Sequence, residues 1–125
     1  MELDGFAPYL MTTGGATISF SKNGIGVSKT AVAKLKNSPH VKILIDRAGR
    51  RLAIQVCEAD DPAATDFART DKLEGTRWNS RDLNATIRQM TGWDVNNNKL
   101  YRVEGTYVHD DKYPALIFDL TTPIS

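Results

Sequence analysis

The sequence contains little that could form a disulfide, a membrane span or a secretion signal. Cys57 is the single cysteine, so no disulfide can form within the chain, which fits a reducing compartment. No apolar run approaches the roughly 18–20 residues of a transmembrane helix. The first ten residues, MELDGFAPYL, carry two acids and no basic segment, unlike a secretory signal. We therefore expect a cytoplasmic protein with no membrane partner.

Side chains suited to catalysis or metal binding are also scarce. His40 and His109 lie far apart in the sequence, and neither has a second His or Cys at the spacing of a metal site. No general base is placed beside Cys57 by the sequence. The acidic runs EADD and HDD lack the ligand spacing and the glycine of a calcium loop. We therefore expect no metal, no cofactor and no enzymatic activity.

One segment, SKNGIGVSKTAVAKL over residues 21–35, looks at first like a phosphate-binding loop. Such a loop needs a glycine directly before its lysine and another six positions before it. Ser28 and Asn23 occupy those two positions before Lys29, so the motif is absent. We interpret Gly24 as a turn residue, and Gly26 as a strand residue that passes close to another backbone.

The sequence does contain a pattern of strands and helices that occurs twice. Residues 16–57 predict a strand in which Ile18 and Phe20 alternate with polar residues, a turn, a short strand, a helix over about 29–36 capped by Ser28, and a hairpin. Residues 76–120 predict a short strand, a helix capped by Asn79 and ended at Gly92, and a second hairpin. The fold class is therefore α+β, with two βαββ units that form one domain over residues 1–125 by internal duplication. Residues 1–15 are a lead-in, and residues 58–75 an acidic linker.

Apolar periodicity predicts which residues form the core. Val32 and Leu35 of the first helix should pack on the first hairpin, and Leu83 and Ile87 of the second helix on the second hairpin. The hairpin residues expected to contact the helices are Ile43, Ile45, Leu52, Ile54, Val103 and Ile117.

Charge is distributed unevenly along the chain. Residues 1–57 hold eight Lys and Arg against three acids, a net charge of +5, and residues 58–125 hold eight against twelve, a net charge of −4. The basic half suggests contacts with phosphate, and the acidic half suggests a different role. On this basis Arg77 and Arg88, in the acidic half, should contribute little to binding DNA.

The run ISFSKNGIGVSKTAVAKLKNSPHVKILIDRAGRRLAIQV resembles the swapped-hairpin AbrB/SpoVT-type DNA-binding domains of bacterial regulators and antitoxins. The similarity covers about residues 16–57: a strand ending in Ser-Lys, a turn at Lys22-Asn23-Gly24, the cap pair Ser28-Lys29, an amphipathic helix and a hairpin turned at Gly49. In that family two chains interleave to complete one barrel. The resemblance implies that the second half of this chain replaces the partner within one swapped-hairpin, barrel-like domain, so we expect a monomer.

These observations lead to a functional expectation. We expect a regulatory, non-enzymatic protein that binds double-stranded DNA through the basic first half. The expected nucleic-acid-binding residues are Lys22, Lys29, Arg47, Arg50 and Arg51. The alternative is a protein-interaction module that has the same barrel and binds a protein partner instead of DNA. A ligand-binding barrel is a more distant alternative.

Overall fold

The computed structural model describes residues 16–22, 24–68, 75–93 and 100–123. It is a mostly-strand domain with eight strands and two helices. The strands are β1 (Thr17–Ser21), β2 (Gly24–Val27), β3 (His40–Asp46), β4 (Arg51–Val56), β5 (Thr65–Asp66), β6 (Thr76–Trp78), β7 (Tyr101–Val108) and β8 (Ala115–Asp119). The helices are α1 (Lys29–Lys34) and α2 (Arg81–Thr91).

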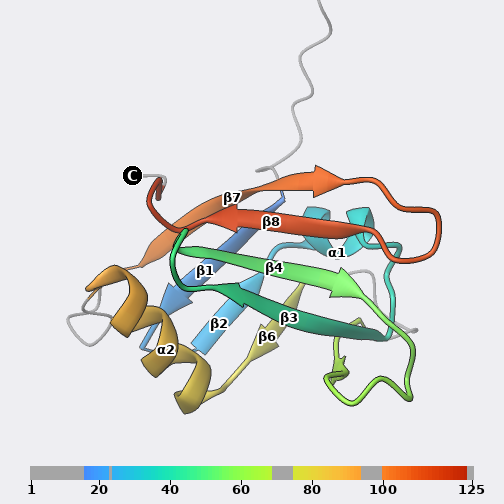
Figure 1. The fold of residues 1–125 in the computed structure, drawn as a ribbon, viewed down its shortest axis with the longest axis horizontal. Helices are drawn as coiled ribbons and strands as arrows, with labels where there is room; N and C mark the ends of the chain where they lie inside the picture. Colours follow the sequence, from blue (N-terminus) through green and yellow to red (C-terminus); the bar gives the residue numbers. More distant parts are fainter. Residues whose placement is uncertain (1–15, 23, 69–74, 94–99, 124–125) are drawn as a thin grey trace, which may run out of the picture.

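All eight strands belong to one antiparallel sheet with the order β5-β3-β4-β8-β7-β1-β2-β6. The sheet curls into a half-barrel, with β3, β4 and β8 on one side of the curve and β1, β2 and β6 on the other (Figure 1). α1 and α2 lie at opposite ends of this curve. Strands of the two predicted units are interleaved in pairs: β3-β4 of the first unit is followed by β8-β7 of the second, then by β1-β2 of the first and β6 of the second. The two units therefore meet where β4 pairs with β8, β1 with β7, and β2 with β6.

The local signals of the first predicted unit are largely confirmed. β1 alternates as expected, with Ile18 and Phe20 fully buried. The Ser28 hydroxyl caps α1 by accepting a hydrogen bond from the Ala31 amide at 3.2 Å. It also accepts one from the Thr17 amide at 3.0 Å, which ties the helix start to β1. α1 is shorter than expected because Lys36 and Asn37 adopt positive φ angles of 62° and 50°.

Gly24 is the turn glycine that was expected, whereas Gly26 differs from its expected role. Gly24 opens β2 after the turn, with a φ of +126°, and a Cβ there would lie 2.7 Å from the Trp78 carbonyl oxygen. The close backbone approach therefore occurs at Gly24, and its expected position at Gly26 was wrong. Around Gly26, no described atom lies within 4 Å of an added Cβ, because that position faces outward from the sheet.

The second predicted unit has the expected order of elements with a shifted helix start. Ser80, and not Asn79, caps α2 by accepting from the Leu83 amide at 3.2 Å. Both residues are good caps, so the sequence alone did not distinguish them. Gly92 ends the helix in the left-handed conformation with a φ of 77°, as glycine allows.

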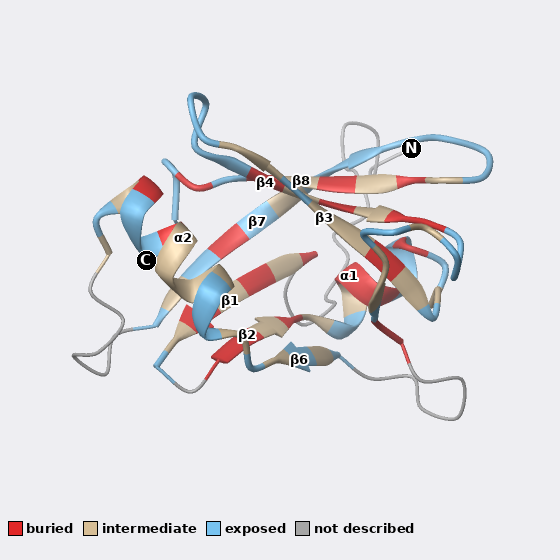
Figure 2. Ribbon diagram, turned by 60° about the horizontal axis from the view of Figure 1, so that its bottom comes forward, coloured by how far each residue is buried: buried red, intermediate tan, exposed pale blue. Residues whose placement is uncertain are grey.

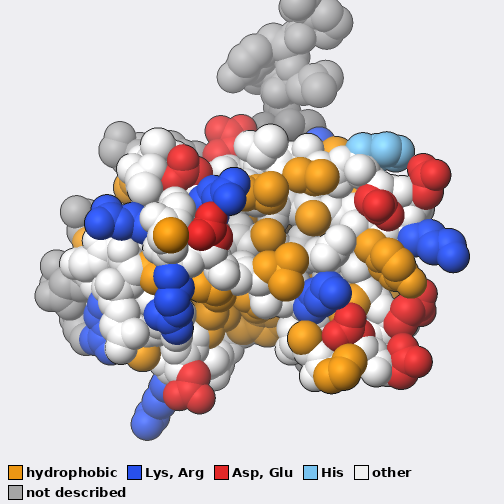
Figure 3. All heavy atoms as spheres, in the orientation of Figure 1, with side chains coloured by type: hydrophobic (Ala, Val, Ile, Leu, Met, Phe, Trp, Pro, Cys, Tyr) orange, Lys and Arg blue, Asp and Glu red, His pale blue; other side chains and the backbone are white. Residues whose placement is uncertain are grey.

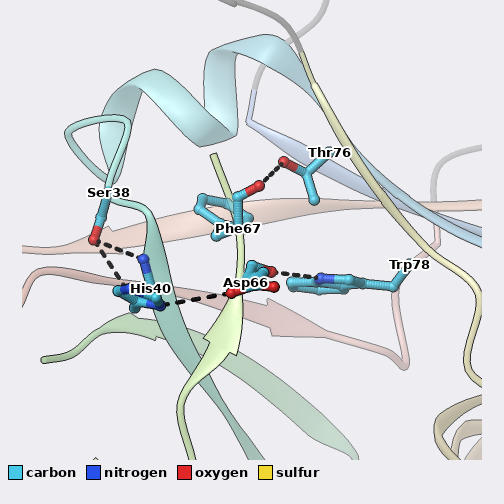
Figure 4. Close-up of polar contacts among 6 residues, drawn as sticks. All are labelled: Ser38, His40, Asp66, Phe67, Thr76 and Trp78. Atoms are coloured by element: carbon cyan, nitrogen blue, oxygen red, sulfur yellow. Dashed lines mark hydrogen bonds and ion pairs between the residues drawn. The ribbon is translucent and has the colours of Figure 1, made fainter. Parts of the chain in front are cut away.

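The predicted acidic linker contributes a strand that the sequence did not indicate. β5 pairs with β3 through His40–Asp66 and Val41–Thr65. Two side chains of β6 bond to the same segment: the Trp78 indole N–H donates to the Asp66 carbonyl at 3.0 Å, and the Thr76 hydroxyl donates to the Phe67 carbonyl at 3.0 Å (Figure 4). These side-chain bonds join the two ends of the curled sheet, β5 and β6.

The core lies inside the curve of the sheet and under α1 (Figure 2). Val32, Leu35, Leu52 and Ile54 are fully buried as predicted, and Ile87 is 1 % exposed. The prediction for Ile117 was wrong. The inward side chains of β8 are Leu116 and Phe118, because β8 pairs with β4 in a register that places them beside Ile54 and Leu52.

Ile43, Ile45 and Leu83 are only partly buried, which also differs from the prediction. The physical reason is that α2 does not close over β3. An open groove of about 580 Å³ lies between them, and these three side chains line it together with Trp78.

Candidate nucleic-acid interface

Three of the expected DNA-binding residues, Arg47, Arg50 and Arg51, lie at the exposed turn between β3 and β4. Arg51 is engaged locally: its Nε and Nη2 donate to Asp46 Oδ2 at 2.9 and 2.7 Å. The Gly49 amide, at 3.0 Å from Asp46 Oδ1, and the Arg51 guanidinium together hold the pKa of Asp46 below its usual value. The positive charge of Arg51 is thus compensated by an acid on the same hairpin.

The other two expected residues, Lys22 and Lys29, are exposed at opposite ends of the β1–β2 hairpin. Lys22 is in the turn that joins the strands, and Lys29 directly follows the Ser28 cap. Because β8 and β7 separate β4 from β1 in the sheet, the structure does not bring these lysines together with the arginines of the β3–β4 turn.

The remaining lysines of the first half have partners within the chain. Lys34 Nζ lies 5.8 Å from the centre of the Tyr107 ring, and Lys36 Nζ donates to the Asp111 carbonyl at 2.9 Å. Lys42 pairs with Asp61 at 3.3 Å. Much of the positive charge counted along residues 1–57 is therefore used to hold neighbouring loops.

A groove on the outer face of β1, β2, β6 and β7 is lined by residues from both halves of the chain, and its two basic residues, Arg77 and Arg102, both come from the second half. Its volume is about 670 Å³. Pairing across four neighbouring strands places Arg102 beside Ser19, Ser19 beside Gly26, and Gly26 beside Arg77. Three strand spacings separate the two arginine backbones, which is about 14 Å. Two exposed arginines therefore flank a floor of small residues.

Of the two predicted lysines, Lys29 borders this groove. Ser28 lines the groove, and Lys29 follows it directly in the chain. Lys22 lies at the far end of the same hairpin. On the outer face of β7, Glu104 adds one exposed carboxylate opposite Thr17. We define the basic face as Lys22, Lys29, Arg77 and Arg102.

Assigning charge to halves of the chain left Arg77 and Arg102 outside the expected binding residues. β6 and β7 belong to the acidic half, but they pair with β2 and β1 of the basic half. The short strand TRW does contain a signal for an outward-facing arginine, because Arg77 stands between two partly buried residues, and side chains alternate between the two faces of a strand.

The cysteine and the two histidines, considered for chemistry from the sequence, have different surroundings, and the Cys57 amide donates to the His40 carbonyl at 3.3 Å. Cys57 is buried, and that burial raises the pKa of its thiol. His40 Nδ1 lies 3.8 Å from Asp66 Oδ1, and His109 Nε2 lies 3.3 Å from Asp111 Oδ1.

Within the described ranges, no three His, Cys, Asp or Glu side chains are grouped closely enough to hold a metal ion. No helix of the described chain is long and apolar enough to cross a membrane.

The outer face of β3, β4 and β8 has a different character, because apolar side chains gather on it (Figure 3). Leu44 pairs with Ala53, and Ala53 pairs with Ile117, so the three lie side by side on the outward surface. Leu44 is 43 % exposed, and Val108 on β7 is 41 % exposed. This apolar face and the basic face belong to different regions of the sheet.

Comparisons with protein families, curated proteins and solved structures give no match.

Proposed function

We propose that this chain is a small cytoplasmic, regulatory, non-enzymatic protein that binds double-stranded DNA through its basic face. The observation that carries the proposal is the groove in which Arg77 and Arg102 flank Ser19 and Gly26. Arginine forms bidentate hydrogen bonds to phosphate, and lysine adds a mobile positive charge. Lys22 and Lys29 extend the positive charge to both ends of the β1–β2 hairpin.

We further propose that the fold is an AbrB-like duplication within one chain. With β5 included, both units contain the elements ββαββ: β1, β2, α1, β3 and β4 in the first, and β5, β6, α2, β7 and β8 in the second. Exchanging each strand of β5-β3-β4-β8-β7-β1 for its counterpart in the other unit reproduces the same order in reverse. The β2–β6 pair is likewise made of counterparts. This symmetry supports an origin in which one chain replaced an interleaved dimer.

The test of DNA binding is a salt titration on random-sequence duplexes. Four phosphate contacts, one from each residue of the basic face, give an expected slope of log affinity against log salt of roughly −3.6, because each neutralised phosphate releases counterion. Binding should be strongest at low salt and similar on all sequences. Absence of a complex on any duplex at low salt would end the DNA-binding proposal.

If the chain is a duplication of this kind, a single copy should fold without a partner. The strand pairs β4–β8, β1–β7 and β2–β6 are all made within one chain, so no partner is needed to complete the sheet. We expect the unfolding midpoint to stay constant over a hundredfold dilution. A midpoint that falls on dilution indicates an obligate dimer, because such a dimer loses stability by mass action.

The alternative function, a protein-interaction module, is favoured by one observation: the outward apolar side chains of Leu44, Ala53 and Ile117. Contiguous exposed apolar surface is typical of protein interfaces. The two functions differ in their response to salt, because apolar contacts do not release counterions. A partner complex that persists at high salt and is lost on Leu44→Asp supports the interaction module.

A further inference from the structure

Gly26 is a glycine for which the fold itself offers no reason. It lies within β2 between the buried residues Ile25 and Val27, and it is not among the described residues with positive φ. In the described part of the chain no atom lies within 4 Å of an added Cβ. Glycine weakens a strand, because it loses more backbone freedom on folding and packs no side chain. Since neither conformation nor packing among the described residues requires a glycine here, we take its small size to indicate a contact from outside the chain.

The neighbours of Gly26 define the chemistry of that contact. Arg77 is its partner on β6, and Ser19 is its partner on β1. Arg102 is the next residue in the same row, paired with Ser19. A group placed over Gly26 would meet a hydroxyl on one side and a guanidinium on each flank. Guanidinium and hydroxyl donors in this arrangement match the oxygens of a phosphate.

The charge around the row agrees with an anionic ligand. Both arginines are exposed and lie on the outward face of their strands. Glu104 is the carboxylate of the same face of β7, two residues beyond Arg102 and opposite Thr17. Because it is two residues along β7 from the row that contains Gly26, it borders the anion site on the β7 side without occupying the row.

We propose that Gly26 marks a phosphate-binding subsite, in which a phosphate group contacts the main chain of β2 and is held by Arg77, Arg102 and the Ser19 hydroxyl. This deepens the proposed function and rests on it for the source of the phosphate, which is the DNA backbone. A phosphate of a small molecule offers the same chemistry. A DNA arm and an inorganic-phosphate arm of the test separate the two sources.

The test in the DNA arm is the variant Gly26→Val. Valine suits a strand, and its side chain enters open space, so we expect the melting temperature to be equal to or higher than that of the wild type. The same side chain occupies the place of the phosphate, so affinity for duplex DNA at low salt should fall at least about tenfold, as expected for loss of a charged hydrogen-bonded contact. Ala53→Val is the matched control. It also adds a β-branched side chain to an outward strand position, but on β4, and should leave DNA affinity unchanged.

The second arm adds inorganic phosphate to ¹⁵N-labelled wild-type protein and follows the amide signals of Gly26 and Ser19. Saturable shifts at these amides, absent in Gly26→Val, are expected.

If Gly26→Val binds DNA and phosphate as tightly as the wild type, the subsite is overturned while DNA binding stands. If the wild type binds phosphate there but no duplex, DNA binding fails and the subsite stands with a small-molecule phosphate. If it binds neither, both proposals are overturned. Should Val lower the melting temperature, Gly26→Ala is assessed by the same criteria.

Discussion

Replacing Leu35 by alanine should lower the free energy of unfolding by roughly 2–5 kcal/mol, the range for large-to-small substitutions in a packed core. Leu35 follows the last residue of α1 and is 0 % exposed, in the same core cluster as Val32 and Val41. Truncation leaves a cavity there that rigid neighbours on several strands cannot fill. Urea-induced unfolding followed by tryptophan fluorescence measures the loss.

Leu83→Ala is the matched comparison for this prediction. Leu83 faces the sheet from α2, but it lines the open groove beside β3 and is only partly buried. Because less apolar surface is removed from water and the groove is already open to solvent, its loss should be clearly smaller than that of Leu35. Equal losses at the two positions would show that α2 packs as tightly as α1, contrary to the structure.

Removing the two arginines of the groove should produce the largest functional loss. In the double variant Arg77→Gln and Arg102→Gln, the aliphatic stems remain, and two phosphate contacts are lost. We expect affinity for duplex DNA at low salt to fall roughly 100-fold, since each charged hydrogen bond contributes about 1.5–3 kcal/mol and such effects are not fully additive. The salt slope should become shallower by about 1.8.

The control for this variant is Arg47→Gln with Arg50→Gln. It makes the same change in net charge at the β3–β4 turn, which lies outside the basic face. Only a small, salt-screened loss is expected there. If the turn variant instead loses more affinity than the groove variant, the protein binds DNA through the residues indicated by the first half of the sequence, and the groove is not the contact.

The double variant Lys22→Ala with Lys29→Ala should lose DNA affinity as the groove variant does, because these lysines belong to the basic face.

Glu104 offers a gain-of-function counterpart in the same assay. It is the exposed carboxylate on the outer face of β7 beside the row of Arg102. Glu104→Gln removes a like charge from the path of the phosphates, so binding at low salt should strengthen, and the gain should vanish as salt screens the repulsion.

Much of the local structure followed from the sequence. The alternation of Ile18 and Phe20, the Ser28 cap and the terminating Gly92 each act within a few residues, so their signals are complete in the chain itself. The order of elements in the two units is local in the same sense. Where two local signals were equally good, as at Asn79 and Ser80, the sequence could not select between them.

What only the tertiary structure decided depends on contacts between distant residues. The inward face of β8 is set by its register with β4, since alternate residues of the run ALIF (115–118) are apolar on both faces of the strand. β5 exists because β3 offers it a partner. Arg77 and Arg102 share a groove with Ser28 because β6 and β7 of the acidic half pair with β2 and β1 of the basic half. Net charge along the chain is a property of the sequence, but the charge of a surface depends on which strands become neighbours, and those pairings join residues far apart in the chain.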